Sequence, residues 1–292
     1  MRERGGALKT ILVGPTLLLL VAFNVFPLVW NVVLSFTNAE LVGGGARSVG
    51  GANYARVFTD PQFATALQRT ALFVLLAVSI ELAIGFALAL ALRRDFKAKT
   101  FVLTTLLVPM MLSPAVMGLD WSLVLNGNYG ILNQILGLAG LGEPQWLTDR
   151  DLKFLSILVV DVWMWTPFMM LIALAGLASI PPAIYEAAEI DRASTWTVFR
   201  RITLPMCAPL LGLAVLLRAT DALKQFDLVM AMSGPNDPST QTLSTLLYQV
   251  VFRDGKVGLG CAYACTVLVV VVALATVFTR YVDRLRERGL TR

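Results

Sequence analysis

Seven charged side chains stand inside long apolar stretches of this 292-residue chain. Holding one charge at the centre of a lipid bilayer costs about 2.5–3.5 kcal/mol on insertion scales, so such groups pair with one another or face a water-filled path. Carboxylates, an ammonium and a guanidinium in that setting can tie helices together, bind the hydroxyl groups of a small solute, or relay protons. The seven are Glu81, Asp120, Asp161, Arg218, Asp221, Lys224 and Asp227.

The composition shows why these residues stand out. The chain is 57% apolar and 15% charged, with a mean hydropathy of +0.72, whereas soluble domains are roughly 45–50% apolar and about 25% charged. This excess excludes a soluble enzyme, a disordered tail and a disulfide scaffold, and it indicates a polytopic membrane protein. Histidine is absent, and the three cysteines, Cys207, Cys261 and Cys265, are typical of packing between helices. We therefore expect no metal, no resident cofactor and no catalytic group.

Six segments carry the roughly 20 predominantly apolar residues that a membrane-spanning helix needs. No linker or composition shift divides the sequence, so residues 1–292 are predicted to form one all-α transmembrane domain. The predicted spans are 9–36, 68–92, 101–125, 153–178, 206–230 and 257–282.

The distribution of basic residues predicts the orientation of these spans. Loops rich in Lys and Arg stay in the cytoplasm, and fifteen of the 24 basic residues fall on one side. We interpret them as a topology signal rather than a nucleic-acid surface, so both termini are predicted to lie in the cytoplasm and the protein in the cytoplasmic (inner) membrane. The fifteen are Arg2, Arg4, Lys9, Arg93, Arg94, Lys97, Lys99, Arg192, Arg200, Arg201, Arg280, Arg284, Arg286, Arg288 and Arg292.

Two spans carry polar residues at helical spacing. Asp161, Met164 and Trp165 share one face of the fourth span, and a carboxylate beside an indole suits a sugar or polyol, whose hydroxyls bond the acid while its C–H faces lie on the ring. In the fifth span, charges of alternating sign recur every three residues. Arg218 favours a structural ion pair; the residues predicted to face a polar path are Asp221, Lys224 and Gln225.

The loop at 180–205 has a specific pattern. Pro181-Pro182 is expected to end the fourth span and to begin a short helix. Within that helix, Glu186-Ala187-Ala188 stands fourteen residues before Ile202-x-Leu204-Pro205. A pair of interfacial helices on lipid headgroups would share the amphipathic character, but not this spacing.

This loop resembles the EAA loop of binding-protein-dependent ABC importer permeases. The resemblance implies a cytoplasmic coupling helix, between spans four and five, that docks on an ATPase subunit. The family has glycine where this chain has Arg192. Because arginine disfavours positive φ, we expect a slightly different exit from the helix, or a lost preference for glycine at one half of the transporter. The residues to which the resemblance assigns coupling are Tyr185, Glu186, Ala187, Ala188, Asp191 and Arg192.

The resemblance covers most of the chain and is closest to the maltose-transporter type of carbohydrate permease. It implies that the polar residues named above in spans four and five occupy site-forming positions. It also implies an alternating-access importer of a sugar or polyol, with a second permease, two ATPase subunits that bind ATP and Mg, and an extracytoplasmic solute-binding protein as partners. Further matching motifs are Leu107-Val108-Pro109, Ser113-Pro114-Ala115-Val116, Tyr129-Gly130-Ile131-Leu132-Asn133 and Gly234-Pro235.

Three alternatives stay open at this point. An ion-coupled secondary transporter would use Glu81, Asp120 or Asp161, although the EAA-like loop argues against it. A membrane scaffold without a transport path would pair all the charges of the fifth span. If the protein is an importer, Glu81 and Asp120 are predicted to bond one helix to another. The same ABC architecture could also carry a phosphorylated polyol, with Lys224 or Arg218 as the partner of the phosphate.

Overall fold

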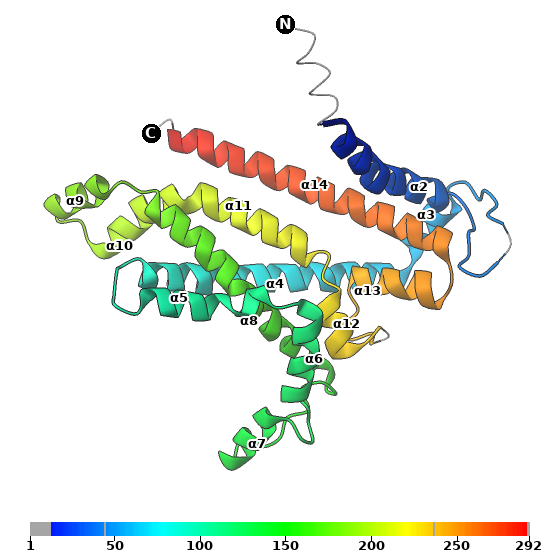
Figure 1. Cartoon of the computed structure of the whole chain (residues 1–292), viewed down its shortest axis with the longest axis horizontal. Coiled ribbons are helices and arrows are strands. Elements are labelled where there is room, and N and C mark those ends of the chain that lie inside the picture. Colours follow the sequence, from blue (N-terminus) through cyan, green and yellow to red (C-terminus); the bar gives the residue numbers. More distant parts are fainter. Residues whose placement is uncertain (1–12, 44, 236, 291–292) are drawn as a thin grey trace, which may run out of the picture. The chain divides into compact units, whose positions relative to one another are not determined.

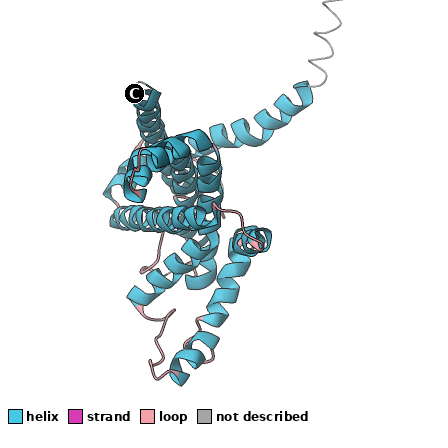
Figure 2. Cartoon of the chain, turned by 90° about the vertical axis from the view of Figure 1, so that its left-hand side faces the viewer, coloured by secondary structure: helices cyan, strands magenta, loops and turns pink. Residues whose placement is uncertain are grey.

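The protein is helical throughout the part that its structure, a computed structural model, describes (Figure 1, Figure 2). The described residues are 13–43, 45–235 and 237–290, with side chains as far as Arg280. Within these ranges there is no strand beyond one isolated bridge, between Thr37 and Ser48. The prediction of an all-α fold is confirmed.

Five helices of the described residues are long and apolar enough to cross a membrane, and each overlaps a predicted span. The first contains the π-turn η1(Val21–Val25) and α2(Phe26–Ser35), and the fourth joins α10(Thr195–Val198), the π-turn η3(Phe199–Thr203) and α11(Leu204–Ala222). The other three are α4(Pro61–Leu92), α8(Arg150–Ala178) and α14(Val257–Leu290). The five ranges are Val13–Ser35, Pro61–Leu92, Arg150–Ala178, Thr195–Ala222 and Val257–Arg280.

The third predicted segment, 101–125, is divided rather than continuous. It consists of α5(Lys99–Leu107), the 3₁₀ turn η2(Pro109–Met111) and α6(Pro114–Val124). The prediction of one helix here was wrong because neither proline has an N–H to donate, and each is placed where a new helical turn starts. Ser113, directly before the second proline, has the extended backbone that a following proline favours.

The fifth predicted segment, 206–230, also ends earlier than expected. Helix α11 stops at Ala222, and α12(Asp227–Ser233) starts a separate helix, so Lys224 and Gln225 lie in the link between them. The carbonyl of Gln225, which no longer bonds within a helix, accepts a hydrogen bond from the Thr242 hydroxyl at 3.2 Å. A tertiary partner therefore satisfies the backbone group that the helix end leaves free.

The chain divides into two compact units, residues 1–64 with 247–270 and residues 65–246 with 271–292. In the first unit, the Asn53 amide of α3(Ala52–Thr59) donates to the carbonyls of Ser35 and Thr37 at 2.9 and 2.8 Å. The Tyr263 hydroxyl donates to the Asp60 carboxylate. These bonds fix the turn that follows the first span.

In the second unit, α8 is the central helix: α11 packs along it, and α12 contacts both α8 and α6. Helix α4 comes very close to α8 at Gly85, where a Cβ atom would lie 2.7 Å from the Cβ of Met169. Small residues allow such close approach between membrane helices. Any larger side chain at Gly85 would push α4 away from α8.

The remaining described helices of the second unit frame the loops predicted to be external. Helix α7(Ile131–Leu138) is bound to the next loop through Asn133, whose Oδ1 accepts from Trp146 Nε1 at 2.7 Å. Helix α13(Leu243–Tyr248) follows the 234–242 loop and leads into the π-turn η4(Gln249–Arg253). At the start of α8, the Asp149 side chain caps the backbone N–H groups of Asp151 and Leu152.

An ion pair between Lys153 and Asp237 fastens the α12–α13 loop to α8. Burial by itself raises the pKa of Asp237, but the hydrogen bonds from Lys153 and from the Ser239 hydroxyl and N–H outweigh it and lower the pKa to about 2. A carboxylate whose pKa falls on folding stabilises the folded state above its unfolded pKa of about 3.9. That stabilisation disappears as the pH falls toward 2.

We expect Asp237→Asn to destabilise the purified protein by about 2 kcal/mol at pH 6, a difference that shrinks between about pH 4 and pH 2. Thermal unfolding in detergent across this pH range measures it. Asp254→Asn is the control, since Asp254 lies in an exposed pair 3.8 Å from Lys256. A difference between wild type and Asp237→Asn that stays constant down to pH 2 would contradict the role given to this pair.

Candidate functional site

A buried arginine occupies the centre of the second unit. Arg218 of α11 is 2% exposed, and Glu81 of α4 receives two parallel hydrogen bonds from it, Nε to Oε2 at 2.9 Å and Nη2 to Oε1 at 3.0 Å. This bidentate geometry is the one that a guanidinium and a carboxylate form best. The pair joins two helices whose residues stand 137 positions apart in the sequence.

Two further acids and an indole complete the surroundings of Arg218. Its Nη2 also donates to Asp161 of α8, and its Nη1 lies 3.4 Å from Asp221 one helical turn away. The ring of Trp165 lies 4.9 Å from the guanidinium carbon, within the range of a cation–π contact. Three helices, α4, α8 and α11, are therefore held at one point.

Gln225 extends this network out of the helices. Its Nε2 donates to the second oxygen of Asp161 at 2.6 Å, so both oxygens of that carboxylate are engaged. In the part of the chain that the structure describes, no buried side-chain nitrogen or oxygen lacks a partner. Asp161 is fully buried, and it therefore positions Arg218 and Gln225 instead of facing open space itself.

The six residues predicted to face a solute divide by exposure. Met164 is buried, like Asp161, whereas Trp165 and Gln225 are partly exposed. Lys224 is exposed, and the Asp221 side chain keeps 53% of its surface. The structure thus brings Asp161, Trp165, Asp221 and Gln225 together around Arg218. Asp161 is enclosed, whereas Trp165, Asp221 and Gln225 keep accessible surface.

Two other intramembrane charges were predicted to be helix ties. Glu81 is one, through its bonds to Arg218. Asp120 of α6 is exposed and makes no ion pair among the described residues, so that prediction was wrong. The sequence analysis did not predict that Glu81 and Arg218 are partners. An arginine inside a span requires an acidic partner from another helix, so Arg218 did predict an acidic partner, although not which one.

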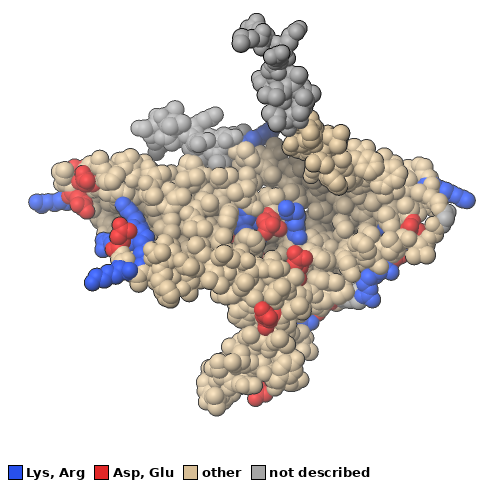
Figure 3. Space-filling model, in the orientation of Figure 1, with Lys and Arg blue, Asp and Glu red and all other residues tan. Residues whose placement is uncertain are grey.

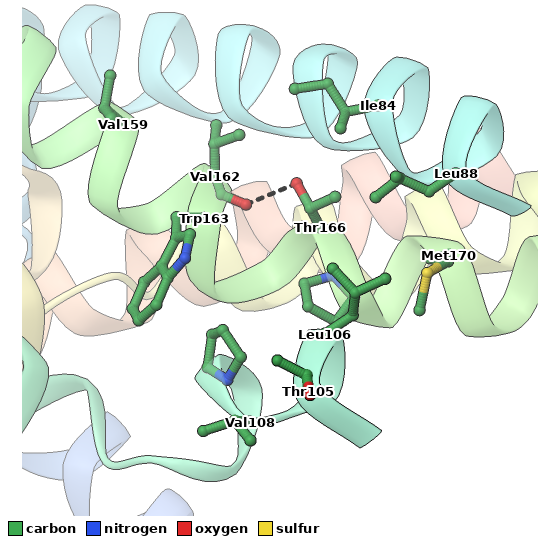
Figure 4. Close-up of a pocket in the computed structure, with 12 residues that line it drawn as sticks. Ile84, Leu88, Thr105, Leu106, Val108, Val159, Val162, Trp163, Thr166 and Met170 are labelled. Atoms are coloured by element: carbon green, nitrogen blue, oxygen red, sulfur yellow. Dashed lines mark hydrogen bonds between the residues drawn. The ribbon is translucent and has the colours of Figure 1, made fainter. Parts of the chain in front are cut away.

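An apolar cavity of about 650 Å³ lies between α4, α5 and α8 (Figure 4). Trp163 and Met170 line it, and the Thr166 hydroxyl on its wall already donates to the Val162 carbonyl at 2.6 Å. A hydroxylated solute would lose its hydrogen bonds to water here and gain few in return. We therefore exclude this cavity as a sugar site.

A short helix, α9(Pro182–Ile190), lies in the loop where a coupling helix was predicted. It lies at the end of the second unit where α4 ends and α5 begins, and charged side chains gather at that end (Figure 1, Figure 3). Ala188 faces inward, whereas Glu186 and Ala187 are exposed and Ile190 keeps 82% of its surface. The Tyr185 hydroxyl lies 3.2 Å from that of Thr203, which anchors α9 to η3.

The exit from α9 corrects one expectation. Arg192 has φ = 52°, the positive φ that glycine adopts easily, and it is the one non-glycine residue of the described chain to do so. The Ala193 N–H donates to the Ala188 carbonyl and the Arg192 N–H to the Glu189 carbonyl, which together form a complete Schellman turn. The helix therefore ends as it would with glycine: arginine replaces glycine at this position, but the backbone turn is the same.

Residues 82–288 match the family model described as "Binding-protein-dependent transport system inner membrane component". This match covers well over half of the chain. The chain belongs to this family. It is thus a permease, a transport subunit and not an enzyme, and the ATPase of such a system is a separate protein.

The permease is similar over nearly its whole length to sugar permeases. It is 32% identical to the trehalose/maltose transport system permease protein MalF of Thermococcus litoralis, over 98% of this chain and 97% of that one. It is 31% identical to the trehalose transport system permease protein SugA of Mycobacterium tuberculosis, over 96% and 89%.

A solved structure has the same fold as the permease. In a bacterial ABC transporter involved in the import of the acidic polysaccharide alginate, one chain matches with a TM-score of 0.85 at 22% identity, over 97% of this chain and 96% of that one. At this level of identity the likeness concerns the fold of the permease and not its solute.

We expect Arg218→Met to destabilise the permease by about 3–5 kcal/mol, because it leaves two buried carboxylates without a partner. The triple variant Glu81→Leu, Asp161→Leu, Arg218→Met removes charge and counter-charge together and should recover most of the lost stability. Thermal unfolding and yield in detergent measure both variants. An Arg218→Met protein as stable as wild type would show that the network holds nothing together.

Proposed function

We propose that this permease moves a neutral sugar, a disaccharide such as trehalose or maltose, across the cytoplasmic membrane by alternating access. The observation that carries the proposal is that the accessible residues Asp221 and Gln225 lie with Trp165 around Arg218, while exposed Lys224 stands in the link directly before Gln225. We call the four residues Asp221, Lys224, Gln225 and Trp165 the polar face. The names of the relatives, trehalose/maltose and trehalose permeases, support the same solute class.

The groups on this face suit sugar hydroxyls. A carboxylate accepts hydrogen bonds, an ammonium donates them, and an amide does both. The Gln225 amide nitrogen is engaged by Asp161, and its side-chain oxygen is the atom that we propose accepts from a sugar hydroxyl. The Trp165 ring, fixed by the Arg218 guanidinium on one side, offers apolar surface to the C–H groups of a pyranose.

The charges around the site favour a neutral solute over a phosphorylated polyol. Arg218 is 2% exposed, is already bonded to Glu81 and Asp161 and lies near Asp221, so its guanidinium is not accessible to a phosphate. Lys224 is then the single remaining cation of the group. Two cations against three carboxylates give a formal local charge of −1, which repels an anion in a region of low dielectric constant.

We also propose that α9 transmits the work of an ATPase partner. Its exposed surface includes Glu186, Ala187 and Ile190, which a docking partner would contact. Docking would involve the predicted coupling set, completed by Tyr185, Ala188, Asp191 and Arg192.

The assembly that follows from family membership has four kinds of component. Besides this chain, we propose a second permease, two ATPase subunits that bind ATP and Mg, and an extracytoplasmic solute-binding protein. Another solved match of the same fold is a chain of a bacterial alginate transporter in complex with an alginate-bound periplasmic protein, which supports a binding protein as the partner. The basic loops support cytoplasmic positions for α9 and both termini.

In this mechanism, the ion-pair network keeps part of the pathway rigid. Closure of the ATPases would displace α9, and Thr195–Ala222 would carry that displacement to Arg218 because it is one continuous helix. Since Arg218 is bonded to α4 and α8, the three helices would move as one body. The polar face would then open to one side of the membrane at a time.

We expect Gln225→Ala or Lys224→Ala to lower the uptake of radiolabelled trehalose or maltose about tenfold, the effect of losing one hydrogen bond to a polar or charged group. Proteoliposomes with the complete transporter and loaded binding protein provide the assay. Asp120→Asn, which alters an exposed acid outside the network, is the control. Unlabelled trehalose should compete with the labelled sugar, whereas trehalose 6-phosphate should not. Equal competition would contradict the preference for a neutral solute.

We expect Glu186→Lys to abolish ATP-driven uptake and to reduce recovery of the ATPase in an affinity pulldown, while membrane insertion stays intact. The charge reversal would oppose docking of α9. Asp95→Lys is matched to it, because Asp95 is an exposed acid on the same predicted side and pairs with Lys99 at 2.8 Å. Wild-type uptake by Glu186→Lys would exclude α9 as the coupling element.

A further inference from the structure

A second cavity, of about 600 Å³, lies between the C-terminal end of α4, the helix α9 and the segment formed by α10 and η3. Leu90 of α4 and the two residues directly after that helix, Arg93 and Arg94, form one wall, and Tyr185 and Glu189 of α9 form another. The third wall comes from α10 and η3, the segment that leads into α11. The cavity thus occupies the joint between a membrane helix and the segment proposed to receive the ATPase.

The cavity has an excess of positive charge. Neither Arg93 nor Arg94 makes an ion pair with any carboxylate among the described residues. The Arg93 guanidinium lies 3.8 Å from the centre of the Tyr185 ring, which fixes its position without neutralising it. Glu189 is the one acid on the lining, so two arginines against one carboxylate give a formal charge of +1.

The rest of the lining combines hydroxyl groups and apolar side chains. Thr195 and Thr203 provide the hydroxyls, and Leu90 and Phe199 provide apolar surface. Leu90 belongs to the last apolar turn of α4, immediately before the basic loop, so the cavity lies at the level where the apolar span ends. A phosphate, hydroxyl groups and hydrocarbon meet at that level in a bilayer.

We propose that this cavity binds the headgroup of an anionic phospholipid, of the phosphatidylglycerol type. The phosphodiester would lie between the guanidinium groups of Arg93 and Arg94, and the glycerol hydroxyls would bond Glu189 and Thr195. The acyl chains would leave past Leu90 along α4. Basic pockets between membrane helices on the cytoplasmic side bind anionic headgroups in this way, and the assignment to the cytoplasmic leaflet rests on the proposed topology.

The bound lipid would stabilise the coupling segment. It contacts α4 on one side and α9 with α10 on the other, so it favours the arrangement in which these elements are close together. Coupling between ATP hydrolysis and transport is then expected to depend on the anionic lipid content of the membrane.

Native mass spectrometry of the detergent-purified complex tests the proposal, with phosphatidylglycerol as the probe and phosphatidylethanolamine as the neutral comparison. We expect wild type to retain phosphatidylglycerol preferentially, and Arg93→Gln/Arg94→Gln to bind it about tenfold or more weakly, since each basic residue near an anionic surface contributes about one factor of five. Arg200→Gln/Arg201→Gln removes the same charge from η3 residues outside the cavity and should bind like wild type.

Arg93→Lys/Arg94→Lys keeps the charge and is expected to recover part of the binding, which separates a loss of lipid from a loss of fold. Four results would overturn the proposal. Two concern the lipid and the variant: equal retention of both lipids, or unchanged binding in Arg93→Gln/Arg94→Gln. The other two are displacement of the lipid by inorganic phosphate at equal concentration, and no bound lipid once the ATPase is assembled. The last would show that the ATPase fills the cavity. Because binding is measured without any sugar, failure here leaves the solute assignment untouched.

Discussion

The second unit depends on one buried cation and the carboxylates around it. A guanidinium inside an apolar bundle is tolerable only when its donors are matched, and Arg218 has acids from two other helices and from its own turn. This requirement fixes the rotation of α4, α8 and α11 about their axes, because a turn of either partner would separate the charges. The close approach at Gly85 reinforces the same register between α4 and α8.

The residues of this network fall into two groups, buried residues that hold the helices together and accessible residues that a solute could contact. Arg218, Glu81 and Asp161 are enclosed, and the groups that remain accessible lie at the end of α11 and in the short link after it. The link is free to depart from helical geometry because Thr242 and Asp161 receive its backbone and side-chain hydrogen bonds. A rigid base under an irregular polar segment is a suitable design for recognising several hydroxyl groups at once.

The sequence predicted the class, the approximate positions of five spans and the short helix α9, because hydropathy and proline positions report on them directly. It predicted Arg218 as structural, but not its partner Glu81, since pairing across 137 residues depends on how the helices pack. The two divided segments were missed for different reasons. In 101–125, Pro109 and Pro114 indicated a break, but the prediction relied on the continuous hydropathy of the segment. The end of α11 at Ala222 depends on tertiary hydrogen bonds, which a local sequence pattern does not reveal. Arg192 shows the opposite case, in which the backbone keeps its turn despite an unfavourable residue.

The unbroken helix from Thr195 to Ala222 also has a mechanical consequence. At 1.5 Å per residue, Arg218 stands about 35 Å along this helix from its start beside α9. A helix of that length acts as a lever arm: a tilt of about 5° about one end displaces the other by roughly 3 Å, about the length of a hydrogen bond. Because Arg218 is also bonded to α4 and α8, a small angular change beside α9 is therefore large enough to shift all three helices, and the polar face with them, by the length of a hydrogen bond.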